Sequence, residues 1–567
     1  MIEATESEQF DAIVIGSGIS GGWAAKELTE KGLNVLVLER GKPIEHGRDY
    51  AGEHVMDWQL PFNGKRPREL YREQYDVQRR CFALSEATRP FFNNDRQNPY
   101  VEDEGKPFNW LRADVVGGRS LLWGRQTYRW CEQDFKANAT DGHGIPWPIG
   151  YDDLAPWYSY VEKFVGISGQ AEGLAQLPDS EFQPPMQMTA LEKVIKSRLA
   201  TYAPDITMTM GRVAILTEDL NGRAACHYCG TCERGCSTGS YFSSQSATLP
   251  AARATGRLTL KADSVVERLV HDASGARIEE VQVINTRTMA RERYRARLFF
   301  LCASTVGSTQ LLMNSASDQH PNGLGNRSDA LGRYMMDHLY GITKAGIFLD
   351  TMDRDVVGVR PNGTYIPRFR NLVGQPQQAD FVRGYGYQAH SLRMGWSSTF
   401  KTTGIGADYK ESLRKPGPWI WALGGFGEVL PRASNRMYLH PTRVDRYGIP
   451  QVVFDCEWGE NERSMAKDIL VSGERILRAA GAVYTLDIGQ MMPPGTGIHE
   501  MGTARMGHDP SEAVLNEHNQ VHGIPNLFVT DGACMTSASC VNPSLTYMAL
   551  TARACDYAVG LMSSQQI

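Results

Sequence analysis

Residues 10–40 read FDAIVIGSGISGGWAAKELTEKGLNVLVLER, and this stretch decides which fold the rest of the chain can adopt. It begins with a short apolar run rich in Ile and Val that stops at a cluster of glycines, as a buried strand does when it enters a turn. The residues around Trp23, Ala24 and Leu28 are typical of a helix, which Gly32 ends before a second apolar run, Val35–Leu38. The stretch therefore predicts one βαβ unit.

Three glycines, Gly16, Gly18 and Gly21, form the pattern G-x-G-x-x-G between the first strand and the helix. Glycine is needed for a tight turn, for close approach of the backbone to a pyrophosphate and for packing of the helix near a strand. The helix N-terminus adds free N–H groups and a partial positive charge. Glu39 follows the second strand, where a carboxylate accepts hydrogen bonds from ribose hydroxyls. The unit predicts an adenine dinucleotide site, and Glu39 disfavours the 2′-phosphate of NADP.

The composition is that of a globular protein with room for two large domains. Of the 567 residues 42% are apolar, and 59 Lys and Arg against 64 Asp and Glu give a formal charge of −5. Because no long run carries one sign of charge, nothing indicates a nucleic acid partner. No apolar run approaches the length of a membrane span.

The first residues, MIEATE, are acidic and contain neither a hydrophobic region nor a twin arginine. We therefore expect the chain to carry no export signal of its own. It is expected to stay in the cytoplasm, or to reach the periplasm by co-export with a partner subunit that has a signal.

The next part of the chain is irregular. Residues 43–100 are rich in Arg, Pro, Asn and aromatic side chains with little periodicity, and predict an irregular lid or excursion. Gly117 and Gly118 precede a helix start and mark a second place where backbone could approach a cofactor. An amphipathic helix with an Asp N-cap is expected further on. Its helical spacing is set by Leu154, Tyr158, Val161 and Val165.

Strands dominate the middle of the chain. Short apolar runs between residues 258 and 301 predict a β-meander joined to a last parallel strand. Residues 341–431 and 437–454 predict a mainly β second domain, and residues 461–480 predict the helix that returns the chain to its last segment.

The last segment of the chain contains several candidate site residues. His499 lies in a glycine-rich loop, where a histidine is often only satisfied by backbone, and Asp531 ends a short apolar strand. Asn542 suits a helix N-cap and Pro543 the first helical position. The positive end of that helix could stabilise a reduced flavin, and Asp531 is placed to hold a polyol chain by hydrogen bonds.

Taken together, these motifs resemble the glucose–methanol–choline (GMC) flavoprotein oxidoreductases, in the family's order over nearly the full chain. The resemblance is carried by the opening glycines, Gly117-Gly118, Cys302-Ala303-Ser304-Thr305 with Leu311-Leu312, Gly325-Asn326, Gly332-Arg333 before His338, the loop from His499 to Gly507, and Asn542-Pro543.

The resemblance implies an α/β fold, with a Rossmann-like FAD-binding domain and a mainly β-sheet substrate domain whose segments are interleaved in sequence. The FAD-binding domain is expected to comprise residues 1–45, 100–130, 205–340 and 490–567. Residues 46–99, 131–204 and 341–489 are expected to form the lid and the substrate domain.

The resemblance also implies roles for single residues. His499 matches the base that takes a hydroxyl proton while a hydride passes to flavin N5, and Asn542 matches its partner at the flavin face. The Asn form of this pair occurs in sugar-oxidising members, which favours a carbohydrate or another alcohol as substrate. The expected cofactor-binding residues are Gly16, Gly18, Gly21, Glu39, Gly117, Gly118, Ser120, Val266, Asp531 and Pro543.

One position departs from some sugar oxidases of the family, which attach the flavin through a histidine. This chain has Leu122 in that segment. We therefore expect FAD to be bound without a covalent link.

A cysteine run forms a separate motif. Cys226, Cys229, Cys232 and Cys236 follow the spacing C-x2-C-x2-C-x3-C of bacterial ferredoxin loops, which favours a [4Fe–4S] cluster, or a [3Fe–4S] form, over zinc. Ser237 stands where the ferredoxin pattern often has Pro, and similar runs in family members without a cluster are only compact loops.

With a cluster, the chain resembles the catalytic subunits of multisubunit sugar dehydrogenases, including glucoside 3-dehydrogenases. These oxidise a ring hydroxyl to a keto-sugar and travel with a small signal-bearing subunit. Electrons would then leave one at a time to an external acceptor of the cytochrome type. The alternatives are an oxygen-using oxidase without a cluster, a lyase that uses the same His499, and a non-catalytic flavin-binding subunit.

Overall fold

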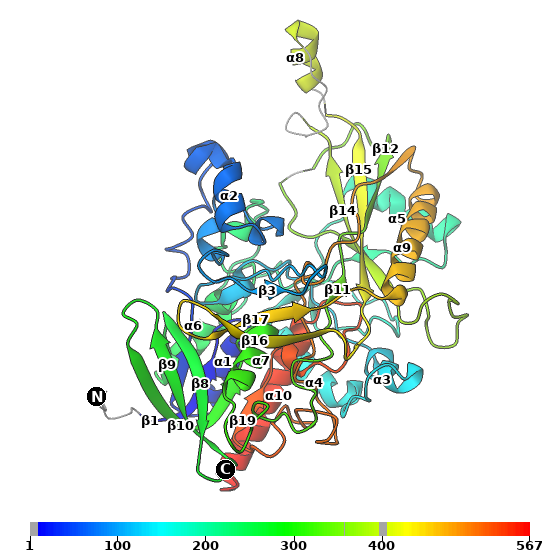
Figure 1. Ribbon diagram of the computed structural model, residues 1–567. Helices are drawn as coiled ribbons and strands as arrows, with labels where there is room; N and C mark the ends of the chain where they lie inside the picture. Colours follow the sequence, from blue (N-terminus) through cyan, green and yellow to red (C-terminus); the bar gives the residue numbers. More distant parts are fainter. Residues whose placement is uncertain (1–8, 357, 396–404, 415) are drawn as a thin grey trace.

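The computed structural model describes residues 9–356, 358–395, 405–414 and 416–567, which form two large sheets with helices on them (Figure 1). The first sheet has the order β7-β2-β1-β10-β9-β8, and β19 pairs with the far end of β10. Its strands are β1 (Gln9–Ile15), β2 (Val35–Leu38), β7 (Leu258–Lys261), β8 (Ser264–His271), β9 (Ile278–Asn285), β10 (Arg291–Leu301) and β19 (Leu527–Val529).

The pairing in this sheet confirms the predicted βαβ unit and meander. β1 pairs in parallel with β2 and with β10, whereas β8, β9 and β10 pair antiparallel in sequence order. The second half of β10 pairs in parallel with β19, so the last segment of the chain returns to the first. As a result, the carboxyl ends of β1, β10 and β19 meet at one edge of the sheet.

Helices pack on this sheet because the strands are apolar on both faces. Trp23, Ala24 and Leu28 of the helix after β1 have no exposed surface. The long C-terminal helix lies beside that helix (Figure 1). The helices of this half are α1 (Ile19–Glu30), α4 (Tyr151–Val165), α6 (Leu249–Ala254), α7 (Ser304–Asn314) and α10 (Ser544–Ser563).

The second sheet has the order β18-β12-β15-β14-β13-β6, with β11 paired to β15, and its pairs are antiparallel. Helices α9 and α5 cover its outer face (Figure 1). The elements are β6 (Thr209–Met210), β11 (His338–Leu339), β12 (Thr343–Phe348), β13 (Thr364–Ile366), β14 (Tyr385–Arg393), β15 (Trp419–Glu428), β18 (Tyr484–Asp487), α5 (Ala190–Tyr202) and α9 (Glu460–Ala479).

Alternation along β14 and β15 separates the two faces of this sheet. Tyr387 and Leu423 belong to the core beneath α5 and α9, whereas Gln388 and Gly424 line a cavity on the opposite face. The second sheet therefore forms a roof over the cavity. Helices cover its outer face, and its inner face is partly polar.

The smaller elements complete the chain. Residues 437–454, predicted as more strand of the second domain, lie instead in a separate sheet of order β16-β17-β3, in which β3 joins β17 from residues 101–102. The bounds are β3 (Val101–Glu102), β16 (Arg436–Val444), β17 (Pro450–Asp455), β4 (Ile167–Ser168), β5 (Phe182–Gln183), α2 (Arg68–Gln74), α3 (Glu132–Asp141), α8 (Gly406–Arg414) and the short η1 (Asp57–Gln59), η2 (Pro61–Gly64), η3 (Gln78–Arg80), η4 (Arg89–Phe91), η5 (Gly118–Leu121), η6 (Cys232–Arg234), η7 (Ser244–Thr248) and η8 (Gly532–Cys534).

The predicted Asp N-cap of α4 is wrong. The N-cap is Gly150, and Asp153 acts from within the first turn, where its Oδ2 accepts the N–H of Gly150 at 2.8 Å. The carboxylate thus satisfies the N-cap backbone from position N3. In the part of the chain that the structure describes, no helix has both the length and the apolar character that a membrane crossing requires.

Candidate active site

A cavity of about 650 Å³ lies between the edge of the first sheet and the inner face of the second. Of the predicted catalytic and cofactor-binding residues, Gly21, Gly117 and Pro543 lie outside its lining. Those that line it are Gly16, Gly18, Glu39, Gly118, Ser120, Val266, His499, Asp531 and Asn542.

The glycine turn after β1 is shaped by contacts that leave no room for side chains at two positions. Gly16 has φ +100°, and a Cβ there would lie 2.4 Å from the carbonyl oxygen of Cys302. A Cβ on Gly21 would lie 1.9 Å from the carbonyl oxygen of Gly16. At Gly18, the N-cap of α1, no heavy atom lies within 4 Å of the Cβ position. The open side of the turn faces the cavity.

Glu39 ties this turn to the end of β2. Its buried carboxylate accepts hydrogen bonds from the N–H of Ser17 at 3.0 Å, the hydroxyl of Ser17 at 2.6 Å and the N–H of Gly41 at 2.7 Å. Burial raises the pKa of Glu39. A carboxylate has about four acceptor positions, so capacity remains for a ribose hydroxyl at the cavity wall.

The second glycine segment packs onto the first turn. Gly117, with φ +94°, donates its N–H to the hydroxyl of Ser17 at 2.8 Å, and a Cβ on Gly118 would lie 3.7 Å from the Cα of Gly18. Ser120 donates its hydroxyl to the carbonyl of Gly117 at 2.6 Å. Two backbone segments that lie far apart in the sequence therefore form one wall.

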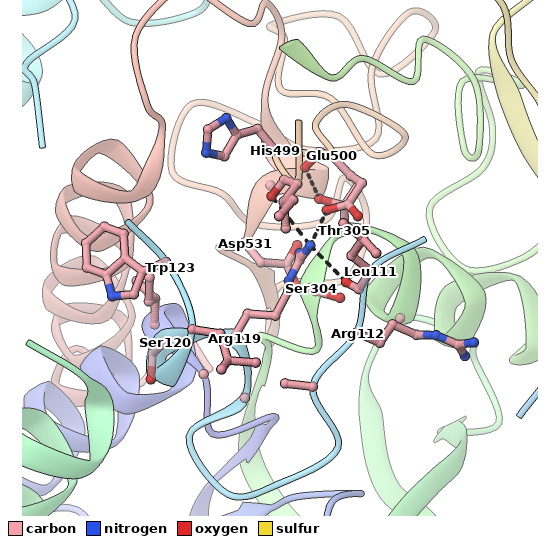
Figure 2. Close-up of a pocket in the computed structure, with 18 of the residues that line it drawn as sticks. Leu111, Arg112, Arg119, Ser120, Trp123, Ser304, Thr305, His499, Glu500 and Asp531 are labelled. Atoms are coloured by element: carbon pink, nitrogen blue, oxygen red, sulfur yellow. Dashed lines mark hydrogen bonds and ion pairs between the residues drawn. The ribbon is translucent and has the colours of Figure 1, made fainter. Parts of the chain in front are cut away.

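Arg119 and Glu500 form an ion pair beneath the histidine loop (Figure 2). Arg119 Nη1 lies 2.6 Å from Glu500 Oε2, and Glu500 is buried. The hydroxyl of Thr305 donates to the carbonyl oxygen of Glu500. The pair connects the glycine wall to the segment that carries His499.

Asp531 follows β19 at the same edge, as predicted from the short apolar strand. Its carboxylate accepts hydrogen bonds from the hydroxyl of Ser308 and from the N–H of Ala533 at 3.0 Å. Burial raises the pKa of Asp531 to about 6, against the lowering effect of the Ser308 hydrogen bond.

His499 and Asn542, predicted to act as a pair, lie together at the cavity. Asn542 Nδ2 lies 3.4 Å from His499 Nε2. On its other side His499 Nδ1 lies 2.8 Å from Nδ1 of His338. Burial lowers the pKa of His499 well below its ordinary range, and His338 and Arg119 lower it further.

The backbone of His499 is held by Asp337. The N–H groups of His499 and Gly497 donate to the two oxygens of this carboxylate at 3.0 and 2.9 Å. Burial, followed by the charge of Glu500, raises the pKa of Asp337 to about 7.

The predicted role of Asn542 as a helix N-cap is wrong. α10 begins at Ser544 with Pro543 as its N-cap residue, and no side chain caps it. The amide of Asn542 is used elsewhere, because its Oδ1 accepts a hydrogen bond from Gln388 Nε2 at 2.6 Å while its nitrogen faces His499.

Two residues of this cluster had no assigned role in the sequence interpretation. His338 was noted only as part of a motif, and Gln388 lies in the β-rich region with little pattern. The signal for Gln388 was the period-2 alternation of β14, which places it opposite the buried Tyr387. The alternation predicts on which face of the sheet Gln388 lies, but not which residue it contacts.

The cavity fits an adenine dinucleotide flavin. Glu500 Oε1 and the Tyr547 hydroxyl are buried atoms without a hydrogen-bond partner among the described residues, and both residues line the cavity. The open space at Gly18 lies at the N-terminus of α1, where N–H groups favour a phosphate. Leu122 is buried and also lines the cavity, and its side chain has no group for a covalent link to the flavin.

The cysteines of the 226–236 run gather around a second cavity of about 20 Å³. All four are free thiols, Cys229 is exposed, and the N–H of Tyr228 donates to Cys226 Sγ at 3.4 Å. Within the described ranges, no three His, Cys, Asp or Glu side chains are grouped so that they could hold a metal ion. The four thiols therefore line one small cavity.

Comparison with known proteins agrees with this geometry. Two family models described as GMC oxidoreductase match residues 10–340 and 431–551. A 2-methyl-1,2-propanediol dehydrogenase from Mycolicibacterium austroafricanum is 30% identical over 98% of this chain and 96% of its own. The fructose dehydrogenase large subunit of Gluconobacter japonicus is 27% identical over 98% of both chains.

Among solved structures, pyridoxine 4-oxidase from Mesorbium loti has a TM-score of 0.60 at 16% sequence identity and covers 97% of this chain and 99% of its own. This likeness is one of fold. Together with the GMC family model it confirms the predicted α/β class, with a Rossmann-like FAD-binding part and a β-sheet part. From the family models and the full-length relative, the chain belongs to the GMC oxidoreductase family and is an FAD-dependent flavoprotein that acts on CH–OH groups.

Proposed function

We propose that this protein is a dehydrogenase that oxidises a secondary hydroxyl of a sugar or glycoside to a keto-sugar. The observation that carries the proposal is the placement of His499 Nε2 and Asn542 Nδ2 3.4 Å apart beneath the β-sheet roof. Two polar groups that converge at one cavity wall suit a single CH–OH group. The naming of one full-length relative as a fructose dehydrogenase subunit favours a sugar.

In this proposal the base is His499. Its lowered pKa keeps the imidazole neutral at neutral pH, so it can take the hydroxyl proton. The Asn542 amide donates to the substrate oxygen and holds it in place. When bound, FAD supplies the acceptor for the hydride.

Residues at the first-sheet edge would hold FAD. The N-terminus of α1 beside Gly18 would bind the pyrophosphate, Glu39 a ribose hydroxyl and Asp531 the polyol chain. Arg119 and Glu500 form an ion pair next to Asp531 and His499 (Figure 2) and would help to hold the ring system.

The residues that line the cavity favour a polyhydroxy substrate over a plain alcohol. Gln126, Thr343 and Gln388 bring polar side chains to the cavity, and Trp123 and Phe426 bring aromatic faces. Polar groups that fix orientation among aromatic surfaces are the common pattern of small-molecule sites.

The test is anaerobic titration of the purified protein with a panel of sugars, glycosides and simple diols. We expect a sugar or glycoside to bleach the flavin absorbance. In His499→Ala the flavin should stay bound but its reduction should slow by about 10²- to 10⁴-fold, the usual contribution of a general base. Reduction of His499→Ala at the wild-type rate would contradict the assignment, and bleaching by diols alone would contradict the substrate class.

The acceptor is the second part of the proposal. We propose that electrons pass to an external carrier of the cytochrome type. An oxygen-using oxidase remains the alternative, since one solved structure of similar fold is an oxidase. Formation of hydrogen peroxide in step with substrate oxidation in air would favour the oxidase.

We propose an iron–sulfur cluster at Cys226, Cys229, Cys232 and Cys236 as the one-electron relay to that carrier. The shared cavity, the free thiols and the N–H···S bond support it, and Tyr241 lines both this cavity and the large one. Iron and acid-labile sulfide of three to four per chain, as expected for such clusters, would support the relay. Iron-free protein that still reduces a cytochrome would exclude it.

We further propose a small signal-bearing partner subunit that carries the chain to the periplasm. The description of one relative as a large subunit supports an assembly of this kind. Fractionation of the native host, with the chain found in the periplasm only when the partner is present, would test it.

A further inference from the structure

An unbroken row of hydrogen bonds crosses the active site. Gln388 Nε2 donates to Asn542 Oδ1 at 2.6 Å, and Asn542 Nδ2 faces His499 Nε2 at 3.4 Å. His499 Nδ1 then faces His338 Nδ1 at 2.8 Å, and His338 Nε2 faces the carbonyl oxygens of Ser539 at 2.9 Å and Ala538 at 3.2 Å. The row joins β14, the segment before α10, the histidine loop and β11.

The end of the row at His338 fixes the direction of every bond in it. Carbonyl oxygens only accept, so the hydrogen of His338 must be on Nε2. A neutral imidazole has one N–H, so Nδ1 of His338 accepts and Nδ1 of His499 donates to it. The remaining nitrogen of His499, Nε2, therefore carries a lone pair.

The other end of the row is consistent with this direction. With a lone pair on His499 Nε2, Asn542 must turn its NH₂ group toward the histidine and its oxygen away. That oxygen meets the NH₂ group of Gln388. The reverse orientation of either amide would place two acceptors against each other, which is unfavourable in a buried site.

We propose that His338 and Gln388 are positioning residues that orient the active site, so that His499 presents its Nε2 lone pair and Asn542 its N–H to the same hydroxyl group. The inference rests on the proposed function. When the hydroxyl O–H bond breaks and His499 Nε2–H forms, the Nδ1–H···Nδ1 bond to His338 is kept, so His338 needs to take no proton.

The surroundings agree with neutral rings. Burial lowers the pKa of His338 to about 4. The charge of Arg119 also disfavours an imidazolium at His499. Of the nearby carboxyl groups, Glu500 is paired with Arg119, and Asp337 accepts the backbone N–H groups of Gly497 and His499.

Two substitutions of His338 separate positioning from proton uptake. His338→Asn offers an amide oxygen where Nδ1 was but has no basic nitrogen, whereas His338→Phe keeps a ring and offers no acceptor. With the best sugar substrate, we expect His338→Phe to slow flavin reduction by about 100-fold and His338→Asn by less than about 10-fold, on the scale of general base catalysis. The pH profile of reduction should shift in His338→Phe and stay close to wild type in His338→Asn.

Either of two results would overturn the proposal: wild-type reduction in His338→Phe, or a loss in His338→Asn equal to that in His338→Phe. Should His338→Phe fail to fold, Gln388→Met carries the test, because it keeps the length of the side chain and removes the donor. If Gln388→Met reduces the flavin at the wild-type rate with saturating substrate, Gln388 does not orient Asn542 and the proposal is contradicted.

A measurement without substrate keeps this inference separate from the function. Neutron diffraction of the wild-type holoenzyme should show deuterium on His338 Nε2 and His499 Nδ1 and none on His499 Nε2. Deuterium on His499 Nε2 would overturn the inference even if a sugar bleaches the flavin. If no sugar does so, the proposed function fails while the neutron result still decides the direction of the row.

Discussion

Gly18 has room for a methyl group that Gly16 lacks, and this difference allows a cofactor effect to be separated from a folding effect. Gly18 has φ −67° and ψ −156°, which alanine also adopts, and its Cβ position is open toward the cavity. Gly16 has φ +100° and a Cβ position 2.4 Å from a backbone carbonyl. If the pyrophosphate binds at Gly18 as proposed, the two glycines of one motif serve the fold and the ligand separately.

We expect Gly18→Ala to fold like wild type but to bind FAD at least about tenfold more weakly, because the methyl group occupies the space of the pyrophosphate and blocks helix N–H groups. Gly16→Ala should lose about 1–3 kcal/mol or more of stability, because its backbone must shift. Thermal unfolding and flavin content measured on both variants check this. Equal FAD content in Gly18→Ala and wild type would contradict the placement of the pyrophosphate.

Also at the residue scale, the sequence predicted which residues lie at the site better than it predicted their hydrogen-bond partners. His499 and Asn542 are predicted as a pair, and they do lie together. This pair could be predicted because the family resemblance indicates which two side chains meet. Its sequence neighbours nevertheless predict a local role for Asn542 as a helix cap. Its actual partner, Gln388, is more than 150 residues away, and only tertiary packing brings it within 2.6 Å.

At the scale of the element, β15 shows how one strand serves the core and the cavity. Gly425 lies against α9, where a Cβ would be 2.5 Å from Ile469 Cγ2. The adjacent Gly424 faces the cavity, and a Cβ there would lie 3.4 Å from the carbonyl of Gln388. The missing side chain of Gly425 lets the helix approach, and that of Gly424 leaves space above the active site.

The neighbouring glycines give a matched pair of variants. Gly425→Ala should destabilise the protein by about 1–3 kcal/mol, because Ile469 is branched at Cβ and cannot swing away. Gly424→Ala should unfold close to wild type but raise KM for a bulky sugar or glycoside. Urea unfolding and steady-state kinetics check both. A larger stability loss in Gly424→Ala than in Gly425→Ala would reverse the assignment of faces.

Which face of the second sheet lines the cavity could not be predicted from the sequence. The strands of the second sheet were predicted as β-rich segments, but Gly and aromatic residues occur on both faces of β15, so hydrophobicity alone did not identify the roof. Residues 437–454 were assigned to the same domain for the same reason. They form another sheet, because β17 pairs with β3 through Val101, a contact between segments over 300 residues apart.

At the scale of the whole molecule, the large cavity that we propose for FAD is assembled from several segments that lie far apart in the sequence. Gly16 belongs to the first segment, Gly118 and Val266 to later ones, and His499 to the last. Arg119 and Glu500 join two of these walls through an ion pair with one buried partner. A ligand in this cavity therefore touches groups that separate when the protein unfolds.

We therefore expect FAD to stabilise the entire fold, in proportion to the logarithm of its concentration. With free FAD at about 100 times its Kd, the gain is about 2.7 kcal/mol. Acid precipitation should release the flavin intact, because Leu122 offers no attachment. After gentle removal, the apoprotein should unfold in one transition at a lower Tm that rises as FAD is added. The same titration of Gly18→Ala should need more FAD for the same shift, and a Tm that does not respond to FAD in the wild type would show that the ligand does not hold these segments together.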